Sequence, residues 1–150
     1  MKYLQSLYKL SALLIVCCLV YCANPSNEHE ASIKQYFGFF NEHNWDKMAE
    51  LYADSALFKD PDIGYYGKIM SQKAIVAKYS ELAEMFPNIK DSVTAIYTDK
   101  SKNVVTVEFI STGTDSSGIS FNLPICTVFK FENGKIKEDF TYYNNQPSIQ

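Results

Sequence analysis

The stretch Phe129-Lys130-Phe131-Glu132-Asn133-Gly134-Lys135-Ile136 decides the fold class of this 150-residue chain. An Asn-Gly pair between two alternating apolar and polar segments is the strongest short signal of a β-hairpin, because its tight turn requires positive φ angles. A long strand is therefore expected over residues 119–132, with a bulge at Pro124, and a last strand over residues 136–142.

Two further alternating segments precede this hairpin. They cover residues 93–98 and 104–112, and turn-forming residues follow them at 99–103 and 115–118. The second half of the chain is therefore expected to form a four-stranded antiparallel meander.

The first half of the chain has the period of helices instead. Ile33, Tyr36, Phe37 and Phe40 form one stripe and predict a helix over residues 28–42. A short second helix is expected after Asn44, and a third over residues 72–86, because Asn44 and Ser71 are good N-caps and Pro87 stops a helix. Short strands are expected between these helices over residues 56–60 and 64–67.

The pattern as a whole predicts one α+β domain. Three N-terminal helices would pack on one side of a mainly antiparallel β-sheet, and a curved sheet covered by helices leaves a cone-shaped space between the two layers. The chain contains ten Phe and eleven Tyr, and a buried Tyr hydroxyl needs a hydrogen-bond partner. Such an interior indicates either a core with polar groups or a pocket for a small apolar or aromatic ligand.

The charge pattern argues against several classes of function. The net charge is −3 and the chain has no Arg, so nucleic acid is not expected as a partner. His29 and His43 are isolated, and Cys126 is the only Cys after residue 22, so no metal site or internal disulfide is expected. No glycine-rich nucleotide motif is present, and no cofactor is expected.

Residues 1–23 have the features of a signal peptide. Lys2 and Lys9 precede an apolar run over residues 10–22, which is too short to span a bilayer well, and residues 24–30 have the composition of a linker. We therefore expect an exported protein in the periplasm or cell envelope; a short uncleaved anchor is the alternative.

The end of this segment, Leu19-Val20-Tyr21-Cys22, resembles a bacterial lipobox. In that case Cys22 would carry the lipid and would be the protein's membrane contact. Tyr21 stands where a lipobox has a small residue. Plain cleavage near Cys22 or Ala23 is therefore the alternative.

Several stretches together resemble the nuclear transport factor 2-like superfamily, in particular its SnoaL-like (polyketide cyclase) and ketosteroid isomerase branches. The stretches are residues 51–54 and 58–61, Gly67, residues 85–88, residues 129–136, Glu138 and residues 142–145. The resemblance implies a cone-shaped domain over residues 31–146.

The resemblance also implies a site. Asp60 lies where ketosteroid isomerases carry their proton-shuttling carboxylate, and Tyr36 lies where they carry the tyrosine that donates to the enolate oxygen. Thr127, or alternatively Pro124, takes the place of a second, acidic donor, and Asn144 stands where cyclases have an acid. The implied activity is a cofactor-free isomerase or cyclase acting on a small apolar carbonyl compound. The expected substrate-binding residues are Tyr52, Tyr79, Phe40, Phe58, Thr127 and Phe129.

Non-catalytic interpretations stay open beside this one. Asp60 before Pro61 is also a common turn-starting pair, and Tyr36 lies on a helix stripe that can simply be core. The domain could be an envelope pocket that binds a ligand without turnover. It could also be an interaction module that forms a homodimer through the open face of the sheet, with residues 104–109 supplying that face.

Overall fold

The computed structural model describes residues 25–64 and 66–144. The predicted signal peptide, with Cys22 as a lipidation site, lies outside the described residues. So do Asn24 and the last two residues of the expected domain, 145–146. In the described part of the chain, no helix is both long and apolar enough to cross a membrane.

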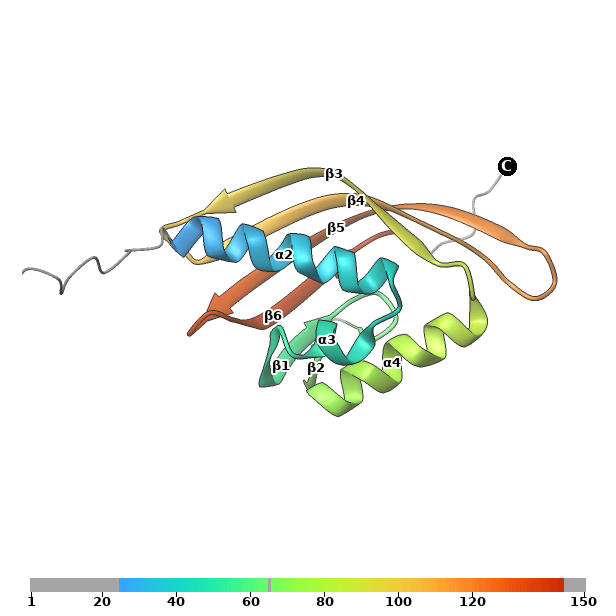
Figure 1. Cartoon of the computed structure of the whole chain (residues 1–150), viewed down its shortest axis with the longest axis horizontal. Coiled ribbons are helices and arrows are strands. Elements are labelled where there is room, and N and C mark those ends of the chain that lie inside the picture. The colour runs from blue at the N-terminus through green and yellow to red at the C-terminus, as the bar shows by residue number, and fades with distance from the viewer. Residues whose placement is uncertain (1–24, 65, 145–150) are drawn as a thin grey trace, which may run out of the picture.

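The architecture is α+β, with helices on one side of a single open sheet (Figure 1). The sheet has six strands in the order β2-β1-β6-β5-β4-β3, and it is mixed because β1 runs parallel to β6 while the other neighbours are antiparallel. In chain order the elements are α2 (Pro25–Asn41), α3 (Trp45–Ala49), β1 (Tyr52–Lys59), β2 (Lys68–Ser71), α4 (Gln72–Met85), β3 (Lys90–Asp99), β4 (Val104–Thr114), β5 (Ser120–Glu132) and β6 (Lys135–Tyr142).

Helix α2 lies across the concave face of the long strands and contacts β3 and β4 (Figure 1). Its expected stripe of Ile33, Tyr36, Phe37 and Phe40 is buried, with no member more than 5% exposed. Burial of each such side chain contributes roughly 1.5–3 kcal/mol before entropy is counted. This stripe therefore fixes α2 against the sheet and places Tyr36 inside the molecule.

Helix α2 begins earlier than its sequence pattern predicts. It includes residues 25–30, which have the composition of a linker. Within this first part, the His29 ring stacks on Phe131, with ring centroids 4.3 Å apart, and only 8% of His29 is exposed. An aromatic contact with β5 therefore extends the helix toward its N-terminus.

The helix caps and the hairpin agree with the sequence. Asn44 Oδ1 accepts a hydrogen bond from the Lys47 N–H, and the Ser71 hydroxyl accepts one from the Ala74 N–H, each at 3.3 Å. Asn133 and Gly134 have φ angles of 52° and 75°, as the tight turn between β5 and β6 requires.

Other details of the sheet differ from the prediction. The return strand expected over residues 64–67 does not form at its described residues, Gly64, Tyr66 and Gly67, because Gly64 and Gly67 adopt φ angles of 96° and 70° that break a ladder. The return strand is β2, and β1 starts at Tyr52, so two strands separate α3 from α4.

The prediction of a bulge at Pro124 is wrong. Pro124 pairs in register with Ile110 of β4. Among the described residues, β6 pairs with β5 only as far as Cys126. No strand on that side therefore needs the backbone N–H that Pro124 lacks. The bulge lies instead between the Lys130–Glu138 and Phe131–Ile136 pairs of β5 and β6.

The residues expected to form a homodimer face, 104–109, alternate between the two sides of the sheet. Val105, Val107 and Phe109 are buried beneath the helices, whereas Glu108 between them is exposed. The apolar members of this strand are therefore core, and pairing through the sheet stays a prediction.

Gly67 is the position where the backbone most clearly requires glycine. A Cβ there would lie 2.5 Å from the Phe58 carbonyl oxygen, and its φ is 70°. Gly67→Ala should therefore lower the free energy of unfolding by about 2–4 kcal/mol, from left-handed strain and overpacking together.

Gly118→Ala is the matched control, because Gly118 has a similar φ of 86° but no atom within 4 Å of the place where a Cβ would lie. Urea unfolding of both variants should show the larger loss for Gly67→Ala. Equal losses would mean that backbone strain alone acts at Gly67.

Candidate functional site

A cavity of about 530 Å³ lies between the concave face of the sheet and the helices. Most of its lining surface is apolar, and the polar groups are carboxyls, hydroxyls and one ammonium. The lining residues include Tyr36, Phe40, Asp60, Asp62, Lys78, Tyr79, Glu81, Phe86, Asp91, Phe109, Ser111, Phe121, Thr127, Phe129, Thr141 and Tyr143.

Six of the eight residues expected in the site line this one cavity: Tyr36, Asp60, Tyr79, Phe40, Thr127 and Phe129. The other two, Tyr52 and Phe58, are not among its lining residues. Both are at most 2% exposed, and their rings stack on each other with centroids 5.2 Å apart. They support the site from behind rather than form its wall.

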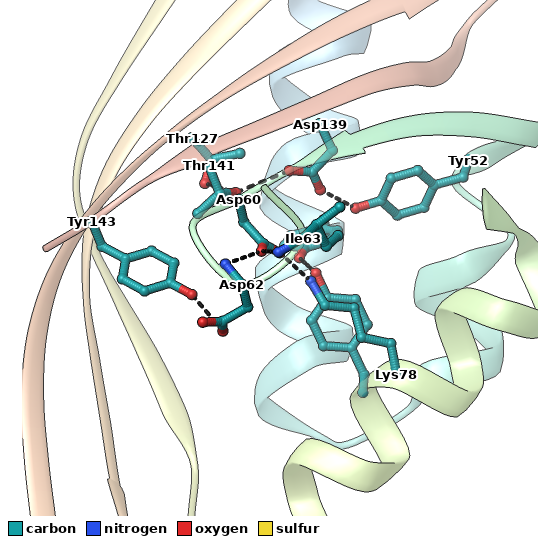
Figure 2. Close-up of polar contacts among 11 residues, drawn as sticks. Tyr52, Asp60, Asp62, Ile63, Lys78, Thr127, Asp139, Thr141 and Tyr143 are labelled. Atoms are coloured by element: carbon teal, nitrogen blue, oxygen red, sulfur yellow. Dashed lines mark hydrogen bonds and ion pairs between the residues drawn. The ribbon is translucent and has the colours of Figure 1, made fainter. Parts of the chain in front are cut away.

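Asp60 follows the end of β1, and both of its carboxylate oxygens are engaged (Figure 2). Oδ1 accepts hydrogen bonds from the Asp62 N–H at 2.9 Å and the Ile63 N–H at 2.7 Å, which makes the turn expected from the Asp-Pro pair. Oδ2 accepts one from Lys78 Nζ of α4 at 2.7 Å. Asp60 therefore holds a turn and also lines the cavity.

This pairing controls the charge of Asp60. Partial burial alone would raise its pKa, but Lys78 and the two backbone N–H groups outweigh burial and hold the pKa below the ordinary value of 3.8. Burial alone would lower the pKa of Lys78, but its contacts with Tyr79 and Asp60 outweigh burial and raise that pKa above its usual range. Both groups are therefore charged at neutral pH, and Asp60 is a weak base while Lys78 is bound to it.

Two phenols meet at the inner end of the cavity. The hydroxyl oxygens of Tyr36, from α2, and Tyr79, from α4, are 3.1 Å apart and share a hydrogen bond. Burial raises the pKa of both phenols, with a further contribution from Asp139 to Tyr36 and from Tyr36 to Tyr79. Both therefore stay protonated, and because one hydroxyl donates to the other, the pair has one proton left to donate to an oxygen in the cavity.

Behind the cavity lies a buried carboxyl that the sequence did not single out. Asp139 Oδ2 accepts a hydrogen bond from the Tyr52 hydroxyl at 2.6 Å, and Oδ1 accepts one from the Thr141 hydroxyl at 3.0 Å (Figure 2). Thr141 in turn lies 2.8 Å from the Thr127 hydroxyl. Burial raises the pKa of Asp139, against the opposing effects of Tyr52 and Lys78.

The bulge explains why Asp139 is missing from the prediction. Strict alternation along the last strand puts Ile136, Glu138 and Phe140 on one face. The register shift after Ile136 turns Asp139 inward, so Ile136 and Asp139 are the buried residues of this strand. A one-residue shift moves every later side chain to the other face.

A second acid, Asp91 on β3, lies on the cavity wall and was also missed. Its backbone is held by Asn41: the Asp91 N–H donates to Asn41 Oδ1 at 2.8 Å, and Asn41 Nδ2 donates to the Asp91 carbonyl at 2.9 Å. The side chain is 7% exposed, and its Oδ1 has no hydrogen-bond partner among the described residues. Burial raises the pKa of Asp91 to about 7, although the Ser111 hydroxyl opposes the shift.

The outer part of the cavity is closed by a different pair. The Tyr143 hydroxyl donates a hydrogen bond to Asp62 Oδ2 at 2.7 Å, and links the end of β6 to the turn after β1 (Figure 2). Burial and the nearby Asp62 raise the pKa of Tyr143.

The described residues contain no group of three or more His, Cys, Asp or Glu side chains placed to hold a metal ion. His43 instead bonds through Nε2 to the Ile89 carbonyl at 3.1 Å, and its ring stacks on Trp45 with centroids 5.1 Å apart. The acid-base groups available in the cavity are therefore carboxyls, phenols and one ammonium.

The fold is of the type found in small-molecule isomerases and cyclases. Residues 33–139 match the SnoaL-like domain family, and the chain belongs to that family within the nuclear transport factor 2-like superfamily. No curated protein matches the chain in sequence.

Solved structures show the same fold at low sequence identity. SalBIII, an epoxide hydrolase/cyclase-like enzyme of pyran ring formation in the polyether salinomycin, is 16% identical, with a TM-score of 0.69 over 79% of this chain and 92% of that one. A Catenulispora acidiphila protein with a ketosteroid isomerase-like fold, in complex with trimethylamine, is 19% identical, with a TM-score of 0.66 over 76% and 85%. Bal32a, from a soil-derived mobile gene cassette, is 15% identical, with a TM-score of 0.70 over 81% and 92%.

Asp91 should make stability depend on pH. Its pKa rises from 3.8 when unfolded to about 7 when folded, so the unfolded state releases its proton first and stability falls as pH rises between these values. The full shift corresponds to a loss of at most about 4 kcal/mol. Asp91→Asn should remove this loss and unfold at higher urea than wild type at pH 8, but not at pH 4.

Glu81→Gln provides the control, because Glu81 is an exposed carboxyl on the same cavity. Urea midpoints of the three proteins from pH 4 to pH 8 test the idea. A wild type-like decline in Asp91→Asn would contradict it.

Proposed function

We propose that this domain performs acid-base chemistry on a small, mostly apolar carbonyl compound, as an isomerase or cyclase without a cofactor. The observation that supports this most is the joint placement of the Tyr36 phenol and the Asp60 carboxylate on one largely apolar cavity. Proton transfer next to a carbonyl needs a base near the C–H bond and a donor near the oxygen that becomes negative. The cavity supplies one group of each kind.

In this proposal the two groups divide the work. Asp60 takes a proton from the carbon beside the carbonyl, the electron pair of that C–H bond forms a C=C bond, and the π pair of the C=O bond moves onto the oxygen. Tyr36, supported by Tyr79 at 3.1 Å, donates a hydrogen bond to the resulting enolate oxygen. Asp60 then returns the proton to another carbon. Alternatively the enolate carbon attacks a second carbonyl and closes a ring, and Asp60 returns its proton to the alkoxide that forms.

Two features of the site set the speed of such a reaction. Lys78 lowers the basicity of Asp60, so the lysine has to move away or be compensated as the proton is taken up. Thr127 supplies a hydroxyl where ketosteroid isomerases have an acidic donor, and its oxygen is already shared with Thr141. Losing one strong oxyanion donor typically costs about 100- to 1000-fold in rate.

A second candidate function is ligand binding without turnover. Its support is the full engagement of Asp60 by Lys78 and two backbone N–H groups, which suits a structural carboxylate as well as a reacting one. The trimethylamine held by the Catenulispora acidiphila protein agrees with a small ligand in this fold. Both candidates need the same cavity.

We further propose that the domain works outside the cytoplasm, as the N-terminal segment suggests, with an attachment to the membrane through a lipid on Cys22. In a bacterial host, Cys22→Ser should then release the protein from the membrane fraction. A wild type that is already unlipidated would favour plain cleavage.

The first experiment is native mass spectrometry of residues 23–150 beside the Asp60→Asn variant. A small molecule that one form retains and the other loses would establish a ligand site at Asp60, and its mass would select substrates for a turnover assay. A bare, dimeric protein in both forms would favour the interaction module.

Once a substrate is known, the two proposed groups can be tested directly. Asp60→Asn and Tyr36→Phe should each lower kcat by about 100-fold or more, because one removes the base and the other an oxyanion donor. Tyr143→Phe is the matched control, since it removes a phenol hydroxyl from the outer part of the same cavity. Unchanged turnover in both Asp60→Asn and Tyr36→Phe would exclude the catalytic proposal.

Lys78→Met tests the ion pair separately. Without the ammonium the pKa of Asp60 should rise, because Lys78 is what most opposes its burial. An ionised base loses activity as pH falls through its pKa, so the acidic limb of the kcat/KM profile should move to higher pH. A limb that does not move would mean that Asp60 is not the titrating base.

A further inference from the structure

Asp91 has features that the proposed reaction does not use. It lies at the start of β3, where Lys90 and Ser92 on either side are exposed and Asp91 is buried on the concave face. Its side chain belongs to the cavity wall, opposite Ser111 on β4. Asp60 and Lys78 come from the turn after β1 and from α4, so Asp91 is supplied by a different part of the sheet.

The backbone of Asp91 is held in place, but its carboxyl lacks a hydrogen-bond partner at one oxygen. Asn41 binds both the N–H and the carbonyl of Asp91, which fixes the backbone. Oδ1 is buried and makes no hydrogen bond with any described residue. An unpaired buried carboxylate oxygen is costly, so this site is completed when a donor group arrives in the cavity.

The charges around the cavity favour a cationic donor. Among its lining residues the only ammonium is Lys78, and that group is bound to Asp60 at 2.7 Å. The other titratable groups that line the cavity are Tyr36 of α2, Asp60 and Asp62 after β1, Lys78, Tyr79 and Glu81 of α4, and Tyr143 after β6. Three of these are carboxyls in addition to Asp91, so cations are attracted.

Aromatic rings supply the rest of the surface. Phe86 and Phe121 pack edge to face with centroids 4.9 Å apart, and Phe109 packs in the same way against Phe37 at 5.0 Å. Phe86, Phe109 and Phe121 all line the cavity. The faces of such rings attract cations and also bury apolar groups.

We propose that the ligand of this cavity carries a protonated amine, which pairs with the Asp91 carboxylate, on an apolar body that packs against the aromatic wall. The proposal rests on the proposed ligand site in this cavity, but it does not require turnover there. It names the chemical class of the ligand, an apolar amine, which the carbonyl chemistry at Asp60 leaves open.

The pH dependence of binding follows from this pairing. Asp91 is neutral well below its pKa of about 7, so an ammonium must displace its proton on binding at low pH. The affinity for an amine should then rise about tenfold per pH unit below 7 and level off above it. A neutral ligand of the same shape should show no such rise.

The experiment uses benzylamine, with benzyl alcohol as the neutral analogue and benzoate as the anionic one. Dissociation constants for the purified protein would be measured by NMR titration from pH 5 to pH 8.5. At pH 8 benzylamine should bind at least about tenfold more tightly than benzyl alcohol, consistent with a partly desolvated charge pair. Benzoate should bind most weakly of the three.

Asp91→Asn should remove both the preference for the amine and its pH dependence. Glu84→Gln, which removes one carboxylate from an exposed position of α4 outside the cavity lining, should change the affinity by less than about threefold, because exposed charges are screened. The comparison of amine with alcohol on the wild type needs no variant, so it holds even where Asp91→Asn fails to fold.

Equal binding of benzylamine and benzyl alcohol, tighter binding of benzoate, no binding of benzylamine, or an amine preference that survives Asp91→Asn would each overturn the proposal. Its failure is distinct from failure of the proposed function. Turnover that depends on Asp60 and Tyr36 without an amine preference would leave the catalysis standing, whereas an Asp91-dependent amine preference without turnover would leave only the amine site.

Discussion

The carboxylate of Asp60 is the constraint on which the site depends. It closes the turn that ends β1 through two backbone N–H groups, and it binds Lys78 of α4. One side chain thus links the end of β1 to α4, the helix that forms another wall of the cavity. Because the same oxygens would have to accept a proton from a substrate, any chemistry here competes with the bonds that shape the site.

At the tyrosines no cation outweighs burial, so their pKa values are raised, whereas that of Asp60 is lowered. Burial keeps the phenols of Tyr36 and Tyr79 protonated, so the inner end of the cavity offers donors without adding charge. Tyr52 performs a related task one layer deeper, where its hydroxyl binds the buried Asp139. These phenols are therefore paired with each other or with Asp139, whereas the buried Oδ1 of Asp91 has no partner among the described residues.

Much of the fold could be predicted from the sequence, because the stripe of α2, the two N-caps and the Asn133-Gly134 turn depend on local chemistry. The resemblance to ketosteroid isomerases, rather than these local signals, pointed to Tyr36 and Asp60, and both residues line the cavity. Asp139 was out of reach, because a bulge changes the facing of β6 and a bulge has no fixed sequence signal. Lys78 and Asp91 depend on how distant segments meet, which a single sequence does not record.

Two carboxyls in one cavity with pKa values moved apart can take different roles. Asp60 is held below 3.8 by a cation and backbone donors, whereas Asp91 is raised to about 7 by burial without a cation. Between these values one is ionised and the other neutral, so they can act as acceptor and donor at the same pH. The asymmetry arises from one lysine: Lys78 reaches Asp60 from α4, and among the lining residues no second ammonium reaches Asp91. A cationic ligand would supply the charge that the protein provides on only one side.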